Sequence, residues 1–159
     1  MPPPTDQHDG IADAVKAQLA AALAAAGVTI DCHAAEDLSK LVAVKTLPFV
    51  ACVPVGPEQE RADWTTNARD GIGFPVAAAY MTSGATDGEK SPAAGGMTMT
   101  QFRRLLWATF HNQRLASFTP ECVCEVSSAG EIWDKDDPAH QKLQTVMIVT
   151  AAGRFPRGS

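Results

Sequence analysis

Two stretches of the chain repeat apolar residues at helical intervals. In the first, apolar residues recur every four positions and alanines fill most of the rest, with Asp9 placed to cap a helix and Gly27 placed to end it. The second stretch follows Thr100, the expected cap, and mixes apolar residues with arginine and histidine. Two helices, each with one apolar side, are therefore predicted. Their apolar positions are Ile11, Val15, Leu19 and Leu23, then Phe102, Leu105, Leu106 and Phe110.

Other runs have strand character. The compact apolar run FVACVPV begins at Phe49, and the run IGFPVAAAY from Ile72 to Tyr80 places its large apolar residues on one parity, which is typical of a strand with one buried face. Pro75 lies on the other parity and cannot donate to a ladder, so we expect an edge strand or a bulge there. Further strands are predicted at residues 28–32, 122–126 and 143–150, and a flexible loop over residues 82–96.

A charge-dense segment, EQERADWTTNARD, separates the two apolar runs and spans Glu58 to Asp70. A two-residue turn is enough to join the strands of a plain hairpin. An ordered connection of a dozen residues usually exists because something contacts it. Trp64 in this segment and Trp133 near the C-terminus are aromatics in polar surroundings, which anchor either under their own fold or in a partner. The segment therefore predicts a partner surface, and a self-contained surface loop is the alternative.

Composition limits the possible functions. The net charge of −5 excludes a uniformly basic nucleic-acid surface, and leaves only a local basic patch open. Arg103, Arg104 and Arg114 could meet phosphate or acidic protein, although solvated helix charges are the usual interpretation. No apolar run approaches the roughly 20 residues of a membrane helix. The start MPPPTDQHDG lacks the pattern of a signal peptide, so we expect a cytosolic product with reduced thiols.

Candidate catalytic and metal-binding residues are few. Cys122 and Cys124 are the only close cysteine pair, and their spacing is not that of structural zinc ligands. On a strand they would share one face and suit buried apolar positions equally well. Cys32 and His33 would point to opposite faces of a strand, so they make a poor nucleophile and base. The acidic run at 134–138 fits a turn better than a calcium loop, and no recognised catalytic motif is present.

The order of elements, taken together, resembles one protein family. The matching features are the helix IADAVKAQLAAALAAAG, the segment DLSKL, the strand ending VPVGPEQERAD, the alternating strand after NARD and the later run WDKDDPAHQKLQTVMIVT. They cover most of residues 11–150. In this order the chain resembles tail-terminator or tail-completion proteins of tailed bacteriophages and prophages, and related neck proteins that join head to tail. It departs from them in the glycine-rich loop at 83–96, in Pro75 and in its proline-rich start.

The chain length fits one domain over residues 1–159, with residues 1–9 as a flexible start and residues 151–159 as a frayed or linker-like C-terminal tail. The resemblance implies an α+β fold. The expected sheet is mixed, mainly antiparallel, and flanked by two main helices, with the long arm between strands. It also implies a structural virion protein at the head-proximal end of the tail, assembled in the host cytoplasm, with no enzymatic activity, no cofactor, no metal and no membrane.

The expected partners are further copies of the chain in a ring, expected to be a hexamer, the tail tube protein and the head-tail connector or stopper protein. DNA would pass through the lumen without specific binding, which suits an acidic protein. The alternatives are another neck component, an assembly adaptor that leaves the particle, and an enzyme using Cys32, His33 or His111. The residues expected to contact other subunits or partners are Glu58, Glu60, Arg61, Asp63, Trp64, Arg69 and Trp133.

Overall fold

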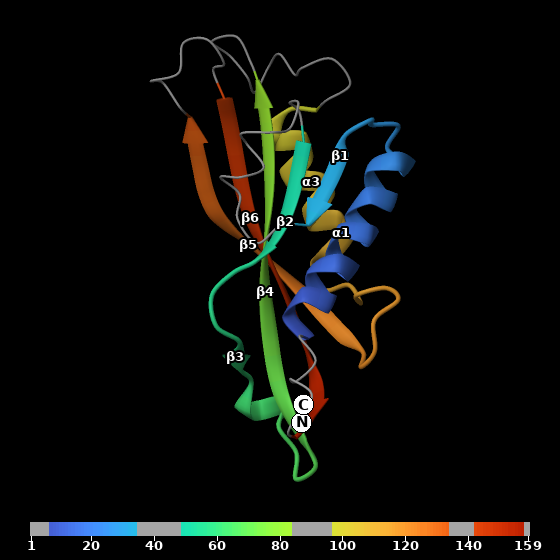
Figure 1. Cartoon of the computed structure of the whole chain (residues 1–159), viewed down its shortest axis with the longest axis vertical. Helices are drawn as coiled ribbons and strands as arrows, with labels where there is room; N and C mark the ends of the chain where they lie inside the picture. Colours follow the sequence, from blue (N-terminus) through green and yellow to red (C-terminus); the bar gives the residue numbers. More distant parts are fainter. Residues whose placement is uncertain (1–6, 35–48, 84–96, 134–141, 158–159) are drawn as a thin grey trace, which may run out of the picture.

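A computed structural model describes residues 7–34, 49–83, 97–133 and 142–157 (Figure 1). Most of the predicted loop at 82–96 and the whole acidic run at 134–138 lie outside these ranges. The helices and strands, in chain order, are α1 (Gln7–Ala25), β1 (Asp31–Ala34), β2 (Phe49–Pro54), β3 (Gln59–Glu60), the 3-10 helix η1 (Ala62–Trp64), β4 (Arg69–Ser83), α3 (Met99–Phe110), β5 (Cys122–Trp133) and β6 (Lys142–Pro156).

The strands form one sheet in the order β1-β2-β4-β6-β5, and β3 pairs with β4 beyond the end of β2. Only β1 and β2 run parallel, and every other pair is antiparallel. β4 and β6 pair along fifteen residues each and form the long axis of the molecule (Figure 1). The predicted α+β fold with a mixed, mainly antiparallel sheet is confirmed.

Both helices pack on the same face of the sheet, where they share one hydrophobic core with alternate residues of the strands. Tyr80 of β4 stacks on Phe102 of α3, with ring centroids 5.0 Å apart, and both side chains are fully buried. The Tyr80 hydroxyl donates to the carbonyl of Met97 (2.6 Å) and accepts from its amide (3.1 Å). The hydroxyl therefore satisfies the hydrogen-bonding needs of two backbone groups just before the N-terminus of α3.

The helix ends follow the expected signals with small shifts. Gly27 has a φ of +74°, and the amides of Gly27 and Val28 donate to the carbonyls of Ala24 and Leu23 (both 3.0 Å), so the predicted glycine terminator is confirmed. The predicted caps are wrong. Helix α1 begins at Gln7, so Asp9 lies in its first turn. Helix α3 is capped by Thr98, whose side chain and that of Gln101 form a capping box.

Pro75 lies in a central strand, so the prediction of an edge strand is wrong. The neighbouring chain is interrupted at this point, because β2 pairs with β4 up to Val76 and β3 pairs with β4 from Gly73. The carbonyl of Pro75 accepts from the Val55 amide (3.1 Å) on that side. In an antiparallel strand the nitrogen and carbonyl of a residue face the same neighbour. The missing N–H of Pro75 therefore faces the interruption, where it costs the ladder no bond.

Two further predictions fail in the same pair of strands. β4 is buried on both faces from Phe74 to Met81, where one buried face was expected. The C-terminal tail is not frayed, because β6 continues to Pro156 and buries Ala151, Ala152 and Phe155. Residues 151–156 of this tail pair with β4, which is as long as β6. The sequence of the tail alone gives no sign of that partner strand.

Candidate functional site

The charged segment Glu58–Asp70 leads into β4. Its residues before Arg69, called the arm below, lie against the first residues of β4, below the helices in Figure 1. Its first part, β3, pairs with β4 in the plane of the sheet, with Glu60 opposite Ile72. Its second part, η1, turns across the sheet face opposite the helices. The arm is thus an ordered lobe that continues the sheet, and its backbone is folded on its own subunit.

Two glycines of β4 allow the arm to lie so close. Gly71 and Gly73 alternate with Ile72 and Phe74, which face the helices, so both glycines face the arm. The amide of Arg61 donates to the carbonyl of Gly71 (2.8 Å). A Cβ atom at Gly71 would lie 2.4 Å from the carbonyl oxygen of Arg61 and 2.5 Å from Cβ of Trp64. Only glycine permits this approach.

Hydrogen bonds hold the rest of the arm to β4 and β6. Thr65 Oγ1 donates to the carbonyl of Arg61 (3.3 Å) and accepts from the amide of Gly71 (3.1 Å). From β6, Arg154 Nε donates to the carbonyl of Trp64 (3.0 Å). Arg157 follows β6 and donates to Asp70 (3.1 Å) and to the carbonyl of Thr66 (3.0 Å).

The Arg61 side chain extends from the arm across the sheet. Its guanidinium passes over Gly73 and donates to Glu125 of β5 (3.2 Å), forming an ion pair. The two side chains remain 28% and 54% exposed, so the pair contributes at most about 1 kcal/mol. Arg61 Nε is buried and has no hydrogen-bond partner among the described residues. The side chain therefore orients the arm more than it stabilises the fold.

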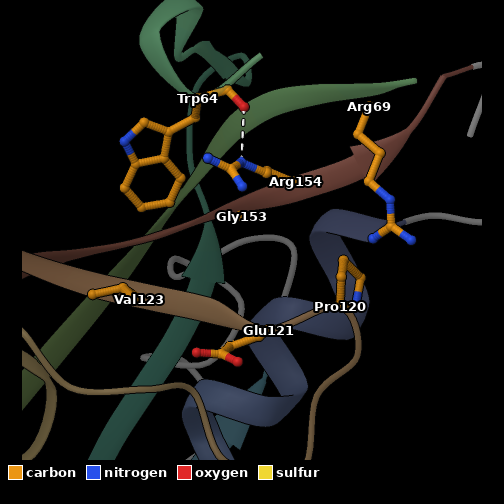
Figure 2. Close-up of a pocket in the computed structure, with 7 residues that line it drawn as sticks. All are labelled: Trp64, Arg69, Pro120, Glu121, Val123, Gly153 and Arg154. Atoms are coloured by element: carbon orange, nitrogen blue, oxygen red, sulfur yellow. Dashed lines mark hydrogen bonds between the residues drawn. The ribbon is translucent and has the colours of Figure 1, made fainter. Parts of the chain in front are cut away.

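One side of the arm borders a basic groove of about 420 Å³. Figure 2 shows Trp64, Arg154 and Arg69 along one side, with the dashed hydrogen bond from Arg154 to Trp64. Pro120, Glu121 and Val123 lie along the other side. Glu121 is paired with Arg114 (2.9 Å), so the charge that remains in the groove is positive. The lining residues are Trp64, Arg69, Pro120, Glu121, Val123, Gly153 and Arg154.

The other side of the arm borders an acidic groove of about 360 Å³. Glu58 and Glu60 are exposed on its rim, and Asp70 lies in it while paired with Arg157. The remaining lining residues are Gln59, Thr65, Gly71 and Ile72. The same short lobe therefore separates two grooves of opposite charge.

The structure places the predicted contact residues in two different situations. The side chains of Arg61 and Trp64 are half-buried against their own sheet, as a self-contained loop requires. Those of Glu58, Glu60, Asp63 and Arg69 are exposed and available to another molecule. The seventh residue, Trp133, ends β5 opposite Leu143, and its side chain lies outside the described part of the structure. Contact with a partner thus stays a prediction for all seven.

A second surface feature was missed by the sequence analysis. Trp107 on α3 is 49% exposed and stacks on His111, with ring centroids 3.8 Å apart and planes 21° apart. His111 Nδ1 in turn accepts from the amide of Val126 on β5 (3.2 Å). Trp107 lies off the apolar stripe of α3, beside Arg103 and Arg104. In the sequence, a tryptophan off the apolar stripe of a predicted helix was the signal that could have indicated this surface feature.

Among the described residues, no three His, Cys, Asp or Glu side chains come together as metal ligands. Cys122 and Cys124 share the helix-covered face, as predicted, and are buried in the core. Burial raises the pKa of Cys52 and Cys124 to about 12 and that of Cys122 to about 11, so these thiols stay protonated at neutral pH. The side chain of His33 is outside the described residues.

Comparison with protein-family models and with curated proteins gives no match to this chain. Within the part of the chain that the structure describes, neither helix combines the length and the hydropathy needed to cross a bilayer.

Proposed function

We propose that the chain is a structural subunit of a bacteriophage neck, a tail-terminator-like protein that assembles into a ring on the tail tube and joins it to the head-tail connector. The order of sequence elements carries the resemblance to that family. A ring subunit needs two different surfaces, one for each neighbour. It needs no reaction centre of its own.

The observation that supports this proposal most is the arm with its two grooves. An ordered lobe at one end of the sheet has exposed carboxylates on one side and arginines on the other. Exposed acidic and basic groups of this kind give orientation and specificity to a protein contact more than raw affinity. This is the arrangement that a head-to-tail contact between identical subunits requires.

The two alternative assembly functions differ in whether the protein is present in the mature particle. A different neck component would also be found in mature particles, whereas an assembly adaptor would leave before maturation. The enzyme alternative relied on Cys32, His33 or His111. In the structure, His111 stacks on Trp107 and accepts a hydrogen bond from the amide of Val126.

Measurements on the purified protein and on phage particles test the proposal. Light scattering and negative-stain imaging of the purified protein should give a ring, with hexamers expected. Mass spectrometry of phage particles from the strain that encodes the chain should give a fixed copy number, and gold-labelled antibody should mark the junction of head and tail. A protein that stays monomeric and is absent from mature particles contradicts the proposal.

A further inference from the structure

We propose that the two grooves beside the arm are the two halves of one interface, in which the basic groove of one copy receives the acidic groove of the next. The inference rests on the proposed function, because it names the surface through which the ring would close. It commits to one occupant of each groove, a second copy of this chain.

The basic groove has cationic groups that the subunit does not use. The Arg69 side chain is exposed and makes no hydrogen bond or ion pair to the described residues, since its bonds to Thr66 are made by the backbone. Arg154 uses only Nε, in its bond to Trp64, which leaves both terminal nitrogens of the guanidinium as donors. Glu121, the acid in this groove, is already paired with Arg114. Two arginines are therefore left to bind carboxylates, for which the planar guanidinium is well suited.

The acidic groove has a matching excess of negative charge. Glu58 and Glu60 are exposed and make no ion pair to the described residues, whereas Asp70 is paired with Arg157. Two carboxylates are therefore left to bind cations. The unused charges of the two grooves match in number, two positive on one side of the arm and two negative on the other.

The placement of the grooves favours a head-to-tail contact. Glu60 lies opposite Ile72, so it shares the helix-covered side of the sheet. Trp64 lies over Gly71 on the opposite face. A symmetric dimer through either groove would bring like charges together, which costs several kcal/mol at close approach. If the arm of each copy lies beside the arm of the next copy, opposite charges meet at every contact. Such a head-to-tail contact forms a ring when the rotation between successive copies closes.

Trp64 adds an apolar anchor to this contact. Its side chain is half-buried and forms one wall of the basic groove, across from Pro120 and Val123 (Figure 2). A tryptophan surrounded by arginines is a common composition for the centre of a protein interface. The charged groups at the rim would then set orientation and rate, so that assembly weakens as salt screens them.

Charge reversal with mixing tests the interface. One variant, Arg69→Glu with Arg154→Glu, makes both grooves acidic. A second variant, Glu58→Arg with Glu60→Arg, makes both grooves basic. Each variant alone should associate at least about tenfold more weakly than the wild type, because only like charges can meet. An equimolar mixture should regain assembly with the two variants alternating, as measured by light scattering and native mass spectrometry.

Control variants separate the interface from folding. Arg154 also holds the arm, so Arg69→Glu alone is the milder variant, since it breaks no contact within the subunit. Arg104→Glu and Asp13→Arg each change one exposed charge on a helix by two units, as Arg69→Glu does, and should leave assembly unchanged. Circular dichroism and thermal midpoints confirm that each variant is folded.

The outcomes distinguish this interface from the proposed function. If the wild type forms rings and the reversed variants form them equally well, or if mixing restores nothing, the interface is wrong and the ring function stands. If the reversed variants keep full assembly while Arg69→Glu with Arg154→Glu loses binding to a phosphate polymer, the basic groove is an anion site and the interface is also wrong. A wild type that is always monomeric and absent from particles overturns both.

Discussion

The two ends of β4 are built in different ways. From Val76 to Tyr80 the strand is buried on both faces and pairs with β2 and β6, and the two helices cover one of its faces. From Arg69 to Gly73 it has charged residues and glycines, and the arm lies over it. One continuous strand therefore passes from an apolar core to a polar lobe.

This difference separates stability from recognition. Burying a large apolar side chain contributes about 1.5–3 kcal/mol, whereas an exposed ion pair contributes at most about 1 kcal/mol. The helix-covered half therefore supplies most of the free energy of folding. The arm half is positioned by backbone hydrogen bonds and close glycine contacts, so its exposed charges are available to a partner without a large loss of stability.

The largest effect is expected from the core. Phe102→Ala removes a fully buried ring that stacks on Tyr80, which should lower the free energy of unfolding by about 3–5 kcal/mol. Urea unfolding followed by circular dichroism measures this loss. If the variant does not fold, Phe102→Leu gives a smaller change in the same direction. A loss below about 1 kcal/mol would show that the helix-covered half is not the main source of stability.

Gly71→Ala should act on the arm more than on the core. The added Cβ would lie 2.4 Å from the Arg61 carbonyl, so the arm must move away. We expect a global loss of about 1–3 kcal/mol, together with faster proteolysis between residues 58 and 69 and loss of self-association. Limited proteolysis with mass spectrometry locates the cleavage.

Gly10→Ala is the matched control for that variant. Among the described residues its Cβ would meet only Phe118, at an ordinary 3.5 Å, and the site lies within α1. Alanine should therefore stabilise the helix by about 0.5–1 kcal/mol without changing proteolysis of the arm. Equal cleavage of the arm in both variants would contradict the role given to Gly71.

Glu125→Gln should have a small effect. It removes the partly exposed ion pair with Arg61 and keeps the size and shape of the side chain. The free energy of unfolding should fall by less than about 1 kcal/mol, and this difference should disappear in high salt. Chemical unfolding at low and high ionic strength measures both. A larger, salt-independent loss would mean that the arm contributes to the core.

The buried thiols should make the free energy of unfolding depend on pH only in alkali. Their folded pKa values of about 11 to 12 lie above the ordinary value of 9.0, so the unfolded chain loses these protons first. The stability they contribute is complete below pH 9 and falls as the pH rises toward 12. Measurement of the free energy of unfolding as a function of pH tests whether stability falls in alkali. Rapid alkylation of Cys52 in the folded protein at pH 8 would contradict it.

Local patterns were sufficient for the parts of the fold that depend on neighbouring residues. The four-residue apolar spacing from Ile11 fixed α1 and its buried side, and Gly27 marked its end because only a flexible backbone readily adopts a positive φ. The parity of Ile72 and Phe74 indicated a strand with an apolar face toward the core. The charge-dense run also indicated an ordered connection between two strands.

What depended on distant partners was decided only by the tertiary structure. Pro75 is tolerated in a central strand because a gap between β2 and β3 faces it, and residues 151–156 are ordered because β4 pairs with them. The basic groove likewise arises where the arm meets β5 and β6, far along the chain. Periodicity reports which side of an element avoids water, whereas the identity of the covering element follows from long-range pairing.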